Sequence, residues 1–534
     1  MSSPRLSAFL LLLRVSCCVL LLGGVASSRP LAAQTVTAIE IERHDVFTGE
    51  VARTFYGKAA NALHIVTRDA AIRRELLIKP GEPYDSALAA ESARNLRRLG
   101  IFRSVRMDTV QTDSGLVLRY ITDDGWSTKA DFRFGSTGDE VTWTVGAYED
   151  NLLGTAAQLA FEHRDTPDRT SNTFLFQRSR LFANKIFFRA EYIDRSDGWR
   201  ALGMTGVPWL SIQSKGRVFL TAFARDERVL RFLEGDPDPS DSLRRVQTIA
   251  RGDFGWAPIA DPRRYLRLGL TAQARRDDFS AWPGPLATTK TVTGEFQFWL
   301  ETSRARFQVL QGFRTFTQQE DIDLSSTLRV GVAAAPSLFG YDETGVGPVL
   351  GLHGGVALGS SAFLTGDARL AAIYRSSGLD SGTALLGTTA GWSDGRRHTL
   401  VAHGEVGWKE NMAPGEEFDL GLGVGPRAFG NHAFTGDREL FFTGEYRFTA
   451  NPDLWGLVGL GVAAFVDHGG AWYAGSATRT GTDAGFGLRI GPSRATSLSV
   501  LRVDLAHRFS TDRQQAGWVL VIGKGFPFQE IGGQ

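Results

Sequence analysis

From residue 125 onward, the chain is a succession of strand-length segments with no helical period between them. The segments alternate apolar and polar residues, and Gly, Asp, Pro or Ser mark the turns that separate them. In residues 501–509, for example, Leu501, Val503 and Leu505 share one face while Arg502 and Asp504 share the other. A sheet of about four hundred residues without covering helices must close on itself, because closure removes its exposed edges. The pattern therefore predicts a large antiparallel β-barrel over residues 125–528.

The length and the two faces of these segments favour a membrane barrel. Many run for about ten residues, which is the length that a tilted membrane strand needs. Thr443 and Glu445 alternate with Phe442 and Tyr446, so one face is polar and the other is apolar. Lipid and lumen alternate in the same way along a membrane strand. A soluble series of β-sandwiches is the alternative, and the scarcity of linkers argues against it.

The first 33 residues have the layout of a cleaved secretory signal peptide. Arg5 precedes an apolar run over residues 8–22, and the small residues Ala32 and Ala33 end the segment. Both cysteines, Cys17 and Cys18, lie within it. Residues 34–534 therefore offer no disulfide and no thiol chemistry.

Charge and motifs exclude several classes of function. The 59 basic and 58 acidic residues leave a formal net charge of +1, and no long basic cluster offers a phosphate-binding surface, so nucleic acid is not an expected partner. The nine histidines form no His-Glu-x-x-His motif, and the chain has no Gly-x-Ser-x-Gly and no Walker-type loop. We expect no enzyme activity, no cofactor and no metal site.

Residues 34–124 differ from the rest, because two helical patterns appear between short strands. We expect Thr67 and Asp85 to be the N-caps of two helices, the second of which ends at Gly100. The predicted strands cover residues 36–41, 63–66, 103–110 and 116–121. A small α/β domain is predicted here.

One loop and two strands carry the candidate site. The loop reads Gly-Pro-Arg-Ala-Phe-Gly over residues 425–430, and Glu445 and Asp467 lie on the polar faces of the next two predicted strands. If the loop folds into the barrel, the planar guanidinium of Arg427 can bridge both carboxylates. The alternative is an ordinary surface loop followed by two strands with unpaired polar residues.

Three segments resemble one family. Residues 81–85 (Gly-Glu-Pro-Tyr-Asp), residues 91–102 and Val105 are similar to the second helix and following strand of a polypeptide-transport-associated (POTRA) domain. Residues 148–154, with Asn151 and Gly154, resemble the early barrel signature of the outer-membrane barrel-assembly and two-partner-secretion superfamily, also called the bacterial surface antigen superfamily. Arg427, Phe429, Glu445 and Asp467 occupy the places of that superfamily's loop clasp in the barrel lumen. Pro426 and Ala428 depart from its loop pattern.

The resemblance implies one periplasmic POTRA-like domain over residues 34–124 and an outer-membrane β-barrel over residues 125–528. It implies an inward loop near residues 425–436, and residues 529–534 remain as a tail. The family has sixteen strands, and the candidate segments exceed that number. Either some pair as extramembrane hairpins or the barrel is larger.

The resemblance also implies a function without covalent chemistry. The expected protein is an insertase or translocase that captures client polypeptides through its POTRA-like domain and helps them into or across the outer membrane. Expected partners are outer-membrane or secreted client polypeptides and membrane lipid, with accessory periplasmic or lipoprotein subunits as further candidates. A weak lateral seam would join residues 129–134 to residues 517–526, where Gly517, Gly523 and Gly525 weaken the ladder. The alternative function is a passive porin-like barrel or a surface antigen.

Overall fold

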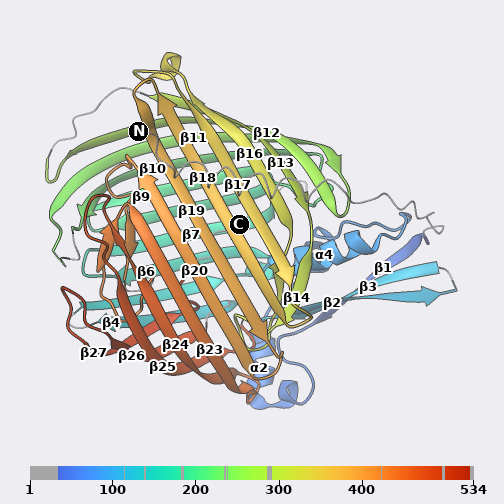
Figure 1. Cartoon of the computed structure of the whole chain (residues 1–534). Coiled ribbons are helices and arrows are strands. Elements are labelled where there is room, and N and C mark those ends of the chain that lie inside the picture. Colours follow the sequence, from blue (N-terminus) through green and yellow to red (C-terminus); the bar gives the residue numbers. More distant parts are fainter. Residues whose placement is uncertain are drawn as a thin grey trace.

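The computed structural model consists of a small α/β domain followed by a large β-barrel (Figure 1). The structure describes residues 34–528 except 114, 138–139, 182–185, 234–235, 237, 285–291, 422–423 and 496–499. The predicted signal peptide and the predicted tail at residues 529–534 lie outside the described residues. Within the described part, no helix has the length and apolar character that a membrane span requires.

The small domain is a three-stranded sheet covered by helices. Its strands are β1 (Val36–His44), β2 (Phe102–Thr112) and β3 (Gly115–Asp124), in the order β1-β3-β2, with β1 parallel and β2 antiparallel to β3. Its helices are η1 (Val51–Arg53), α2 (Phe55–Leu63), α3 (Asp69–Arg73) and α4 (Ser86–Arg98). Leu96 of α4 is buried in one apolar core with Leu118 and Tyr120 of β3.

The N-cap prediction holds for α4 and fails for the first helical pattern. The Asp85 carboxylate accepts hydrogen bonds from the backbone N–H groups of Ala87 and Leu88. Thr67 does not cap α3, whose N-cap is Arg68. Instead, the backbone N–H and the hydroxyl of Thr67 both donate to Asp124 Oδ2, at 2.7 and 2.8 Å. The predicted strand at residues 63–66 is also wrong, because α2 extends to Leu63 and the chain after it forms no strand.

The barrel is a closed ring of twenty antiparallel strands, more than the sixteen of the family. Its first half comprises β4 (Thr128–Thr137), β5 (Glu140–Glu149), β6 (Ala157–Asp165), β7 (Thr170–Leu181), β8 (Ile186–Arg195), β9 (Gly198–Val207), β10 (Gly216–Arg231), β11 (Asp241–Ala260), β12 (Arg264–Ala281) and β13 (Thr293–Arg304). Its second half comprises β16 (Ser326–Ala335), β17 (Gly345–Ala357), β18 (Ala362–Arg375), β19 (Gly378–Ser393), β20 (His398–Glu410), β23 (Arg438–Leu454), β24 (Val458–Trp472), β25 (Gly481–Pro492), β26 (Leu501–Arg508) and β27 (Gly517–Lys524). Neighbouring strands in the sequence are neighbours in the ring, and β27 lies beside β4.

Two strand pairs stand outside the ring. The segment at residues 307–316 is of strand length and belongs by its sequence to the same series, but it forms β14 (Phe307–Gln311), which pairs with β15 (Gln319–Asp323) in a separate hairpin between β13 and β16. A second small pair, β21 (Phe418–Leu420) and β22 (Phe434–Gly436), lies in the connection between β20 and β23. The excess of segments is therefore explained mainly by a larger barrel, and the additional hairpin packs against the apolar cluster in the lumen.

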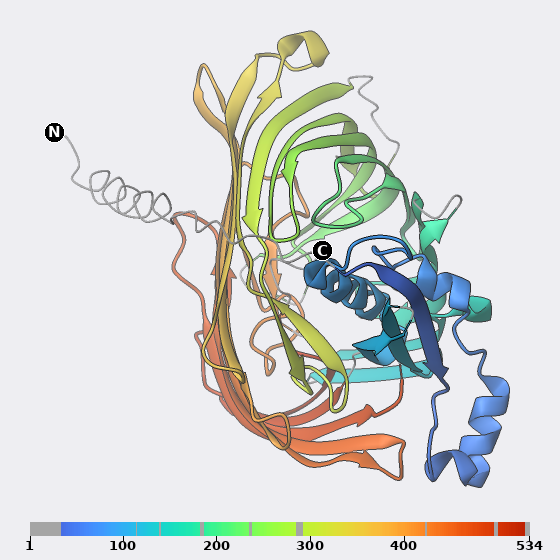
Figure 2. The ribbon, with the colours of Figure 1, turned by 90° about the vertical axis from the view of Figure 1, so that its right-hand side faces the viewer.

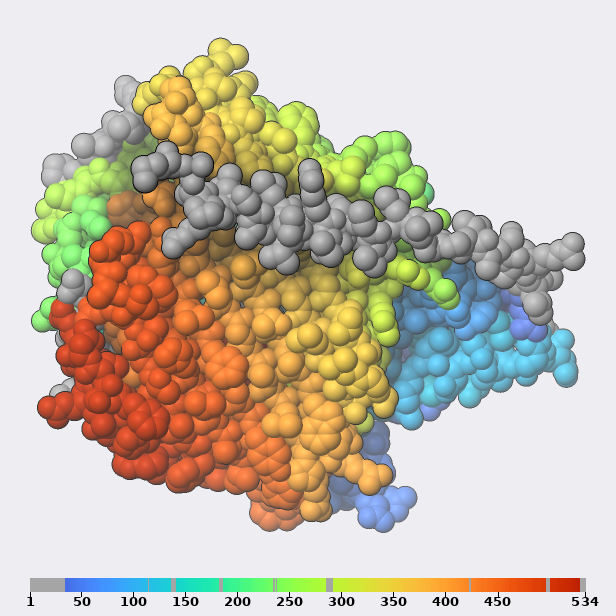
Figure 3. Space-filling view, in the orientation of Figure 1, coloured from blue at the N-terminus to red at the C-terminus, as the bar shows by residue number. Residues whose placement is uncertain are grey.

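The alternation predicted from the sequence separates the two faces of the wall. Phe442 and Val466 are exposed on the outside, whereas Thr443, Glu445 and Asp467 are buried on the inside. The exposed apolar residues are spread around the ring and include Phe132, Phe254, Phe298, Phe486 and Trp518. This is the transmembrane, all-β architecture expected from the sequence, with lipid outside and polar residues inside. Figure 3 shows the continuous outer wall built by the strands from β17 to β27.

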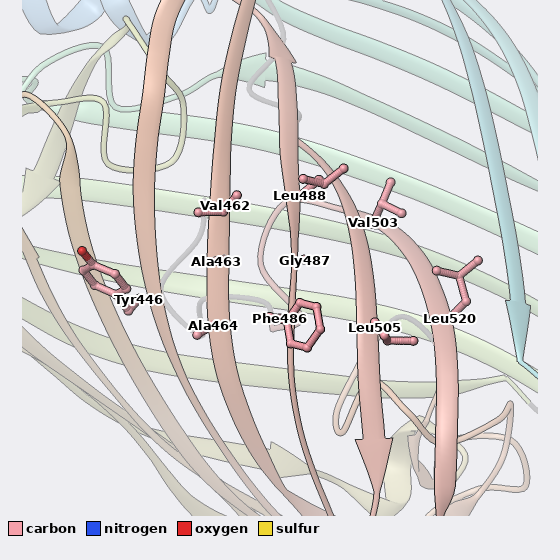
Figure 4. Close-up of a pocket in the computed structure, with 10 residues that line it drawn as sticks. All are labelled: Tyr446, Val462, Ala463, Ala464, Phe486, Gly487, Leu488, Val503, Leu505 and Leu520. Atoms are coloured by element: carbon pink, nitrogen blue, oxygen red, sulfur yellow. The ribbon is translucent and has the colours of Figure 1, made fainter.

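An apolar groove of about 480 Å³ crosses β23 to β27 on the outer wall (Figure 4). Phe486, Leu488 and Leu505 line it, and the small side chain of Ala464 leaves the room between them. Since the groove lies on the apolar outer face, it suits contact with lipid.

The small domain is docked against one end of the barrel, which we call the domain end (Figure 2). The Arg97 guanidinium of α4 forms a bidentate pair with Asp321 of β15, at 2.6 and 2.7 Å. Glu75, after α3, binds Arg180 of β7 at 2.7 Å. Tyr56 of α2 donates a hydrogen bond to the carbonyl of Trp455, in the turn between β23 and β24. The contacts reach turns on both sides of the ring, so the domain spans the mouth of the barrel.

Candidate functional site

The connection between β20 and β23 folds into the lumen and carries Arg427. Arg427 is 1% exposed, and Ala428 and Phe429 are fully buried. The inward loop predicted near residues 425–436 is therefore the arrangement in the structure, and the exposed surface loop is not.

Arg427 contacts both predicted carboxylates. Its Nε donates to Asp467 Oδ2 at 2.6 Å, and its Nη1 donates to Glu445 Oε2 at 3.0 Å. The guanidinium also lies 3.7 Å from the centre of the Phe465 ring. A planar cation held by several acceptors and by an aromatic face has one orientation, which fixes the tip of the loop against β23 and β24.

The cluster contains residues that the sequence reasoning missed. Arg427 Nη1 also donates to Asp504 of β26 at 3.1 Å, and Arg489 of β25 binds both Asp504 and Glu445. The backbone N–H of Ala428 donates to Asp483 of β25 at 3.0 Å. Asp504 and Arg489 lie at inward positions of alternating segments, and this alternation was the signal in the sequence that could have identified them as lumenal residues. Their contacts with Arg427 and Glu445 depend on the register of β23 to β26, which the sequence does not give.

The formal charges of this cluster cancel. The buried charged residues are four arginines, Arg427, Arg447, Arg489 and Arg502, and four carboxylates, Glu445, Asp467, Asp483 and Asp504. Buried ions are tolerated when each is paired and hydrogen-bonded, because the pairing offsets the loss of hydration. We call these eight residues the lumenal clasp.

An apolar cluster holds the same loop from the side of the domain end. Phe429 of the loop, Phe313 of the β14–β15 hairpin and Phe528 near the C-terminus belong to one buried cluster with Phe363 and Val401 of the wall. The backbone N–H of Gly425 donates to the carbonyl of Pro527 at 3.2 Å. The loop, the hairpin and the C-terminal segment together fill part of the lumen.

The last strand ends earlier than the sequence indicates. β27 ends at Lys524, and Phe526 is not part of it. Gly525 has φ 64°, a left-handed conformation that glycine adopts without strain, and it turns the following residues into the lumen. Phe528 then stacks on His403 of β20 with ring centroids 4.0 Å apart.

Two of the three predicted seam residues lie on the strand that closes the ring, and Gly525 follows its end. Gly517 and Gly523 are on β27 and pair with Arg508 and Arg502 of β26, respectively. On the other side of β27, Lys524 forms an ion pair with Asp131 of β4. The weakness of this seam stays a prediction.

Asn151 and Gly154 join the barrel to the small domain. Asn151 is buried in the turn between β5 and β6, and its Nδ2 donates to Thr67 Oγ1 at 2.9 Å. The carbonyl of Gly154 accepts a hydrogen bond from Arg68 N at 2.9 Å. Gly154 has φ 70°, and a Cβ atom there would lie 2.8 Å from the carbonyl oxygen of Val66. This early barrel segment therefore fits closely against residues 66–68 of the small domain.

At the end of the barrel away from the domain, His432 links three connections. Its ring lies between the carboxylates of Asp419 and Asp168, at 2.6 and 2.9 Å, and stacks on Phe232 at a centroid distance of 3.5 Å. Burial alone would lower the pKa of His432, but the hydrogen bonds to Asp168 and Asp419 raise it to about 9.

The geometry of the lumenal clasp suits positioning. All three guanidinium nitrogens of Arg427 donate to acceptors, and these bonds hold the loop in place. Within the described residues, no group of three or more His, Cys, Asp or Glu side chains is arranged to hold a metal ion.

Comparison with protein families identifies the small domain. Residues 64–125 match the POTRA family model, described as a surface antigen variable number repeat. This segment is a POTRA domain. The chain thus joins a POTRA domain to a transmembrane β-barrel, and the family match confirms the POTRA part of the resemblance. The POTRA domain includes α3, α4, β2 and β3, and β1 completes its sheet.

Solved structures with similar chains include two kinds of barrel protein. BamA from Haemophilus ducreyi lacking POTRA domains 1–3 is 13% identical, with 92% of this chain and 84% of that chain covered and a TM-score of 0.37. CdiB from Acinetobacter baumannii is 11% identical, with 92% and 74% covered and a TM-score of 0.44. CdiB from Escherichia coli is 10% identical, with 98% and 99% covered and a TM-score of 0.45. A search of curated protein sequences found no match. Because the TM-scores lie below 0.5, the function of this chain is inferred from its own residues.

Proposed function

We propose that this protein is an outer-membrane insertase or translocase, which captures client polypeptides with its POTRA domain and assists their insertion into or passage across the membrane. The observation that carries the proposal is a POTRA domain docked across the mouth of a transmembrane barrel. In this proposal the domain end faces the periplasm.

Client capture would use the free side of the POTRA sheet. An exposed edge strand can bind an extended polypeptide through main-chain hydrogen bonds, with side-chain pockets adding selectivity. The sheet has edge strands β1 and β2. Because β15 contacts β2 and α4, the β2 edge faces the barrel. The β1 edge, on the other side of the sheet, is the better place for a client strand.

The lumenal clasp supports this function by keeping the inward loop in one position. Arg427 ties the loop to β23, β24 and β26, the strands that approach the closing strand β27. We propose that the clasp is a positioning device for the loop and not a client-binding site. Accessory periplasmic or lipoprotein subunits stay a prediction.

The proposal is tested by reconstituting the protein without residues 1–33 into liposomes and adding an unfolded barrel client from the side of the POTRA domain. The client should become protected from protease faster than with a bare porin as control. Deletion of residues 34–124 should abolish the acceleration while the barrel still shifts in heat-modifiable gel mobility.

Two results would overturn the proposal. Steady ion conductance without client acceleration would identify a passive porin-like barrel. Acceleration that persists without residues 34–124 would remove client capture from the POTRA domain.

A further inference from the structure

A basic and aromatic surface lines the lumen at the domain end, on the side of β10 to β13 and β16. Strand alternation places four arginines on the inner face: Arg217, Arg251, Arg267 and Arg329. Residues at the opposite alternating positions of the same strands are exposed on the outer face: Val218, Phe254, Leu268 and Val330. Arg251 and Arg329 are 41% and 31% exposed in their side chains, so they are open to the lumen. This surface is separate from the lumenal clasp, which lies on β23 to β26.

Two carboxylates lie close to these four arginines. Asp253 accepts hydrogen bonds from Arg251 at 3.1 and 3.2 Å, and Arg217 and Arg329 lie close to the same carboxylate. Glu301 lies 3.6 Å from Arg267 and 3.8 Å from Arg329. Two positive charges are left over, whereas the formal charges of the clasp cancel.

Aromatic rings hold the guanidinium groups in fixed planes. The Arg267 guanidinium lies 4.1 Å from the centre of the Trp209 ring and 3.6 Å from that of Tyr265. Arg329 lies 4.1 Å from the centre of the Trp299 ring. Trp209 belongs to the turn between β9 and β10, where Ser211 also accepts a hydrogen bond from Arg267. Stacked guanidinium groups lose little further entropy when they bind a planar anion.

Three of the described guanidinium nitrogens on this surface are buried without a partner. Among the described residues, the Nε atoms of Arg217, Arg267 and Arg329 are buried without a hydrogen-bond partner. Arg267 is only 6% exposed. A buried donor without a partner costs free energy, but these Nε atoms are closed to a ligand, so the exposed side chains of Arg251 and Arg329 are the ones that an acceptor reaches.

Helix α4 of the POTRA domain borders the same surface. Glu91 accepts a hydrogen bond from Ile212 N at 2.7 Å and lies near Arg267, Arg94 and Arg98. The adjacent Arg97 and Asp321 neutralise each other. Among the described residues near Glu91, Asp253 and Glu301, the charged groups are these three carboxylates and six arginines, Arg94, Arg98, Arg217, Arg251, Arg267 and Arg329, whereas Glu75, near Arg98, is neutralised by Arg180. The difference is three positive charges.

We propose that this surface binds an acidic segment of a polypeptide that enters the lumen past the POTRA domain. The inference rests on the proposed function, and it names the chemistry of the client that the barrel mouth prefers. Carboxylates match the paired donors of a guanidinium, and the alternating rings offer flat surfaces for the remaining side chains. The surface lies inside the ring, away from the apolar outer wall, which favours a polypeptide over a lipid headgroup.

The test uses the full protein without residues 1–33 in detergent and a fluorescent Gly/Ser peptide that contains several Glu residues. The control peptide has Gln at the same positions. The Glu peptide should bind about tenfold more tightly or better, and added salt should remove the difference, because charge-assisted hydrogen bonds and long-range attraction are both involved. Fluorescence anisotropy gives both affinities.

Matched variants assign the binding to this surface. Arg251→Gln with Arg329→Gln should reduce the affinity for the Glu peptide to that for the Gln peptide. Arg251→Lys with Arg329→Lys should keep part of it, because the charge remains while the paired donors are lost. Arg264→Gln with Arg396→Gln removes the same charge from exposed turns at the domain end and should change nothing. Heat-modifiable mobility verifies that every variant is folded.

Three outcomes would overturn the inference. The first is equal affinity for the Glu and Gln peptides, and the second is equal affinity of the Arg251/Arg329 and Arg264/Arg396 variants for the Glu peptide. The third is displacement of the bound Glu peptide by inorganic phosphate as effectively as by unlabelled Glu peptide, which would show a general anion site. The insertion assay separates this inference from the proposed function. If the Glu peptide binds but clients are not inserted, the acidic-peptide site stands and the insertase function is wrong. If clients are inserted but peptide binding does not depend on charge, the function stands and the acidic-peptide site is wrong.

Discussion

Arg427 shows what a single side chain can fix inside a barrel. A guanidinium that is 1% exposed is stable only if its donors are used, and here carboxylates from β23, β24 and β26 accept them. The clasp therefore ties three strands and one loop together through one residue. The ion pairs between its arginines and Glu445, Asp467 and Asp504 explain why these charged residues can be buried side by side.

Replacing Arg427 with Ala should destabilise the folded barrel by about 3–5 kcal/mol, because Glu445, Asp467 and Asp504 would lose the cation that compensates them. Arg427→Lys keeps the charge but cannot bridge three acceptors, so its loss should be intermediate. Heat-modifiable gel mobility measures the stability, and the liposome assay measures client insertion. The control is Arg264→Ala, whose side chain is exposed. Wild-type behaviour of Arg427→Ala in both measurements would contradict the role assigned to the clasp.

His432 should make the far end of the barrel sensitive to alkaline pH. Its pKa is about 9 in the folded protein, raised above the ordinary value by Asp168 and Asp419 despite burial. The stabilisation is therefore complete below about pH 6.5 and is lost as the pH rises through about 9. Ala433→Cys, in the protein without residues 1–33, should be labelled faster through this window relative to the unfolded protein at the same pH, a ratio that removes the intrinsic pH dependence of the thiol. In His432→Gln this relative rate should be high throughout, whereas His398→Gln, near the domain end, should behave as wild type.

At the scale of elements, alternation within one strand was predictable and association between distant elements was not. The polar faces of β23 and β24 follow from a period of two, so Glu445 and Asp467 could be placed on the inside. Asp504 and Arg489 have the same alternation, but their contact with Arg427 depends on strand register. Thr67 has the residue type of a helix cap, and its tertiary contact with Asp124 took precedence over that local preference.

The two unpredicted elements in the lumen share one cause. The β14–β15 hairpin has the alternation of an ordinary strand pair, and Phe526 and Phe528 have the apolar character of a strand end. Both segments instead join the buried cluster around Phe429. Their positions follow from the large lumen of a twenty-stranded ring, which these segments partly fill. The number of strands could not be determined from the sequence, so these positions could not be predicted.

Phe528→Ala should therefore loosen the inward loop from below. Truncating a buried Phe costs about 3–5 kcal/mol, since its packing against His403 and the loop is lost. The labelling rate of Ala433→Cys should rise, while Phe509→Ala, an exposed residue at the other end of the barrel, should leave it unchanged. Equal labelling in the two variants would show that the C-terminal segment does not support the loop.

At the scale of the whole molecule, the POTRA domain and the barrel form one closed arrangement. The domain contacts the wall through Asn151, Arg180 and Trp455, and it contacts the β14–β15 hairpin through Asp321. The hairpin in turn reaches the apolar cluster in the lumen. A client captured by the POTRA domain can enter the lumen only if this docking opens.

The bidentate pair between Arg97 and Asp321 is the contact best suited to test this opening. Both side chains are mostly buried, so Asp321→Arg should weaken docking by about 1.5–3 kcal/mol through the lost charge-assisted hydrogen bonds, with added repulsion from Arg97. The weaker docking should increase ion conductance across planar bilayers and the hydrogen exchange of α4. Asp323→Arg, two residues away on β15 and facing His353, is the matched control. Exchanging the partners in Arg97→Asp with Asp321→Arg should restore low conductance, because the pair is rebuilt in the opposite direction. Conductance that rises equally in Asp321→Arg and Asp323→Arg, or that the exchange does not reduce, would mean that domain docking does not close the barrel.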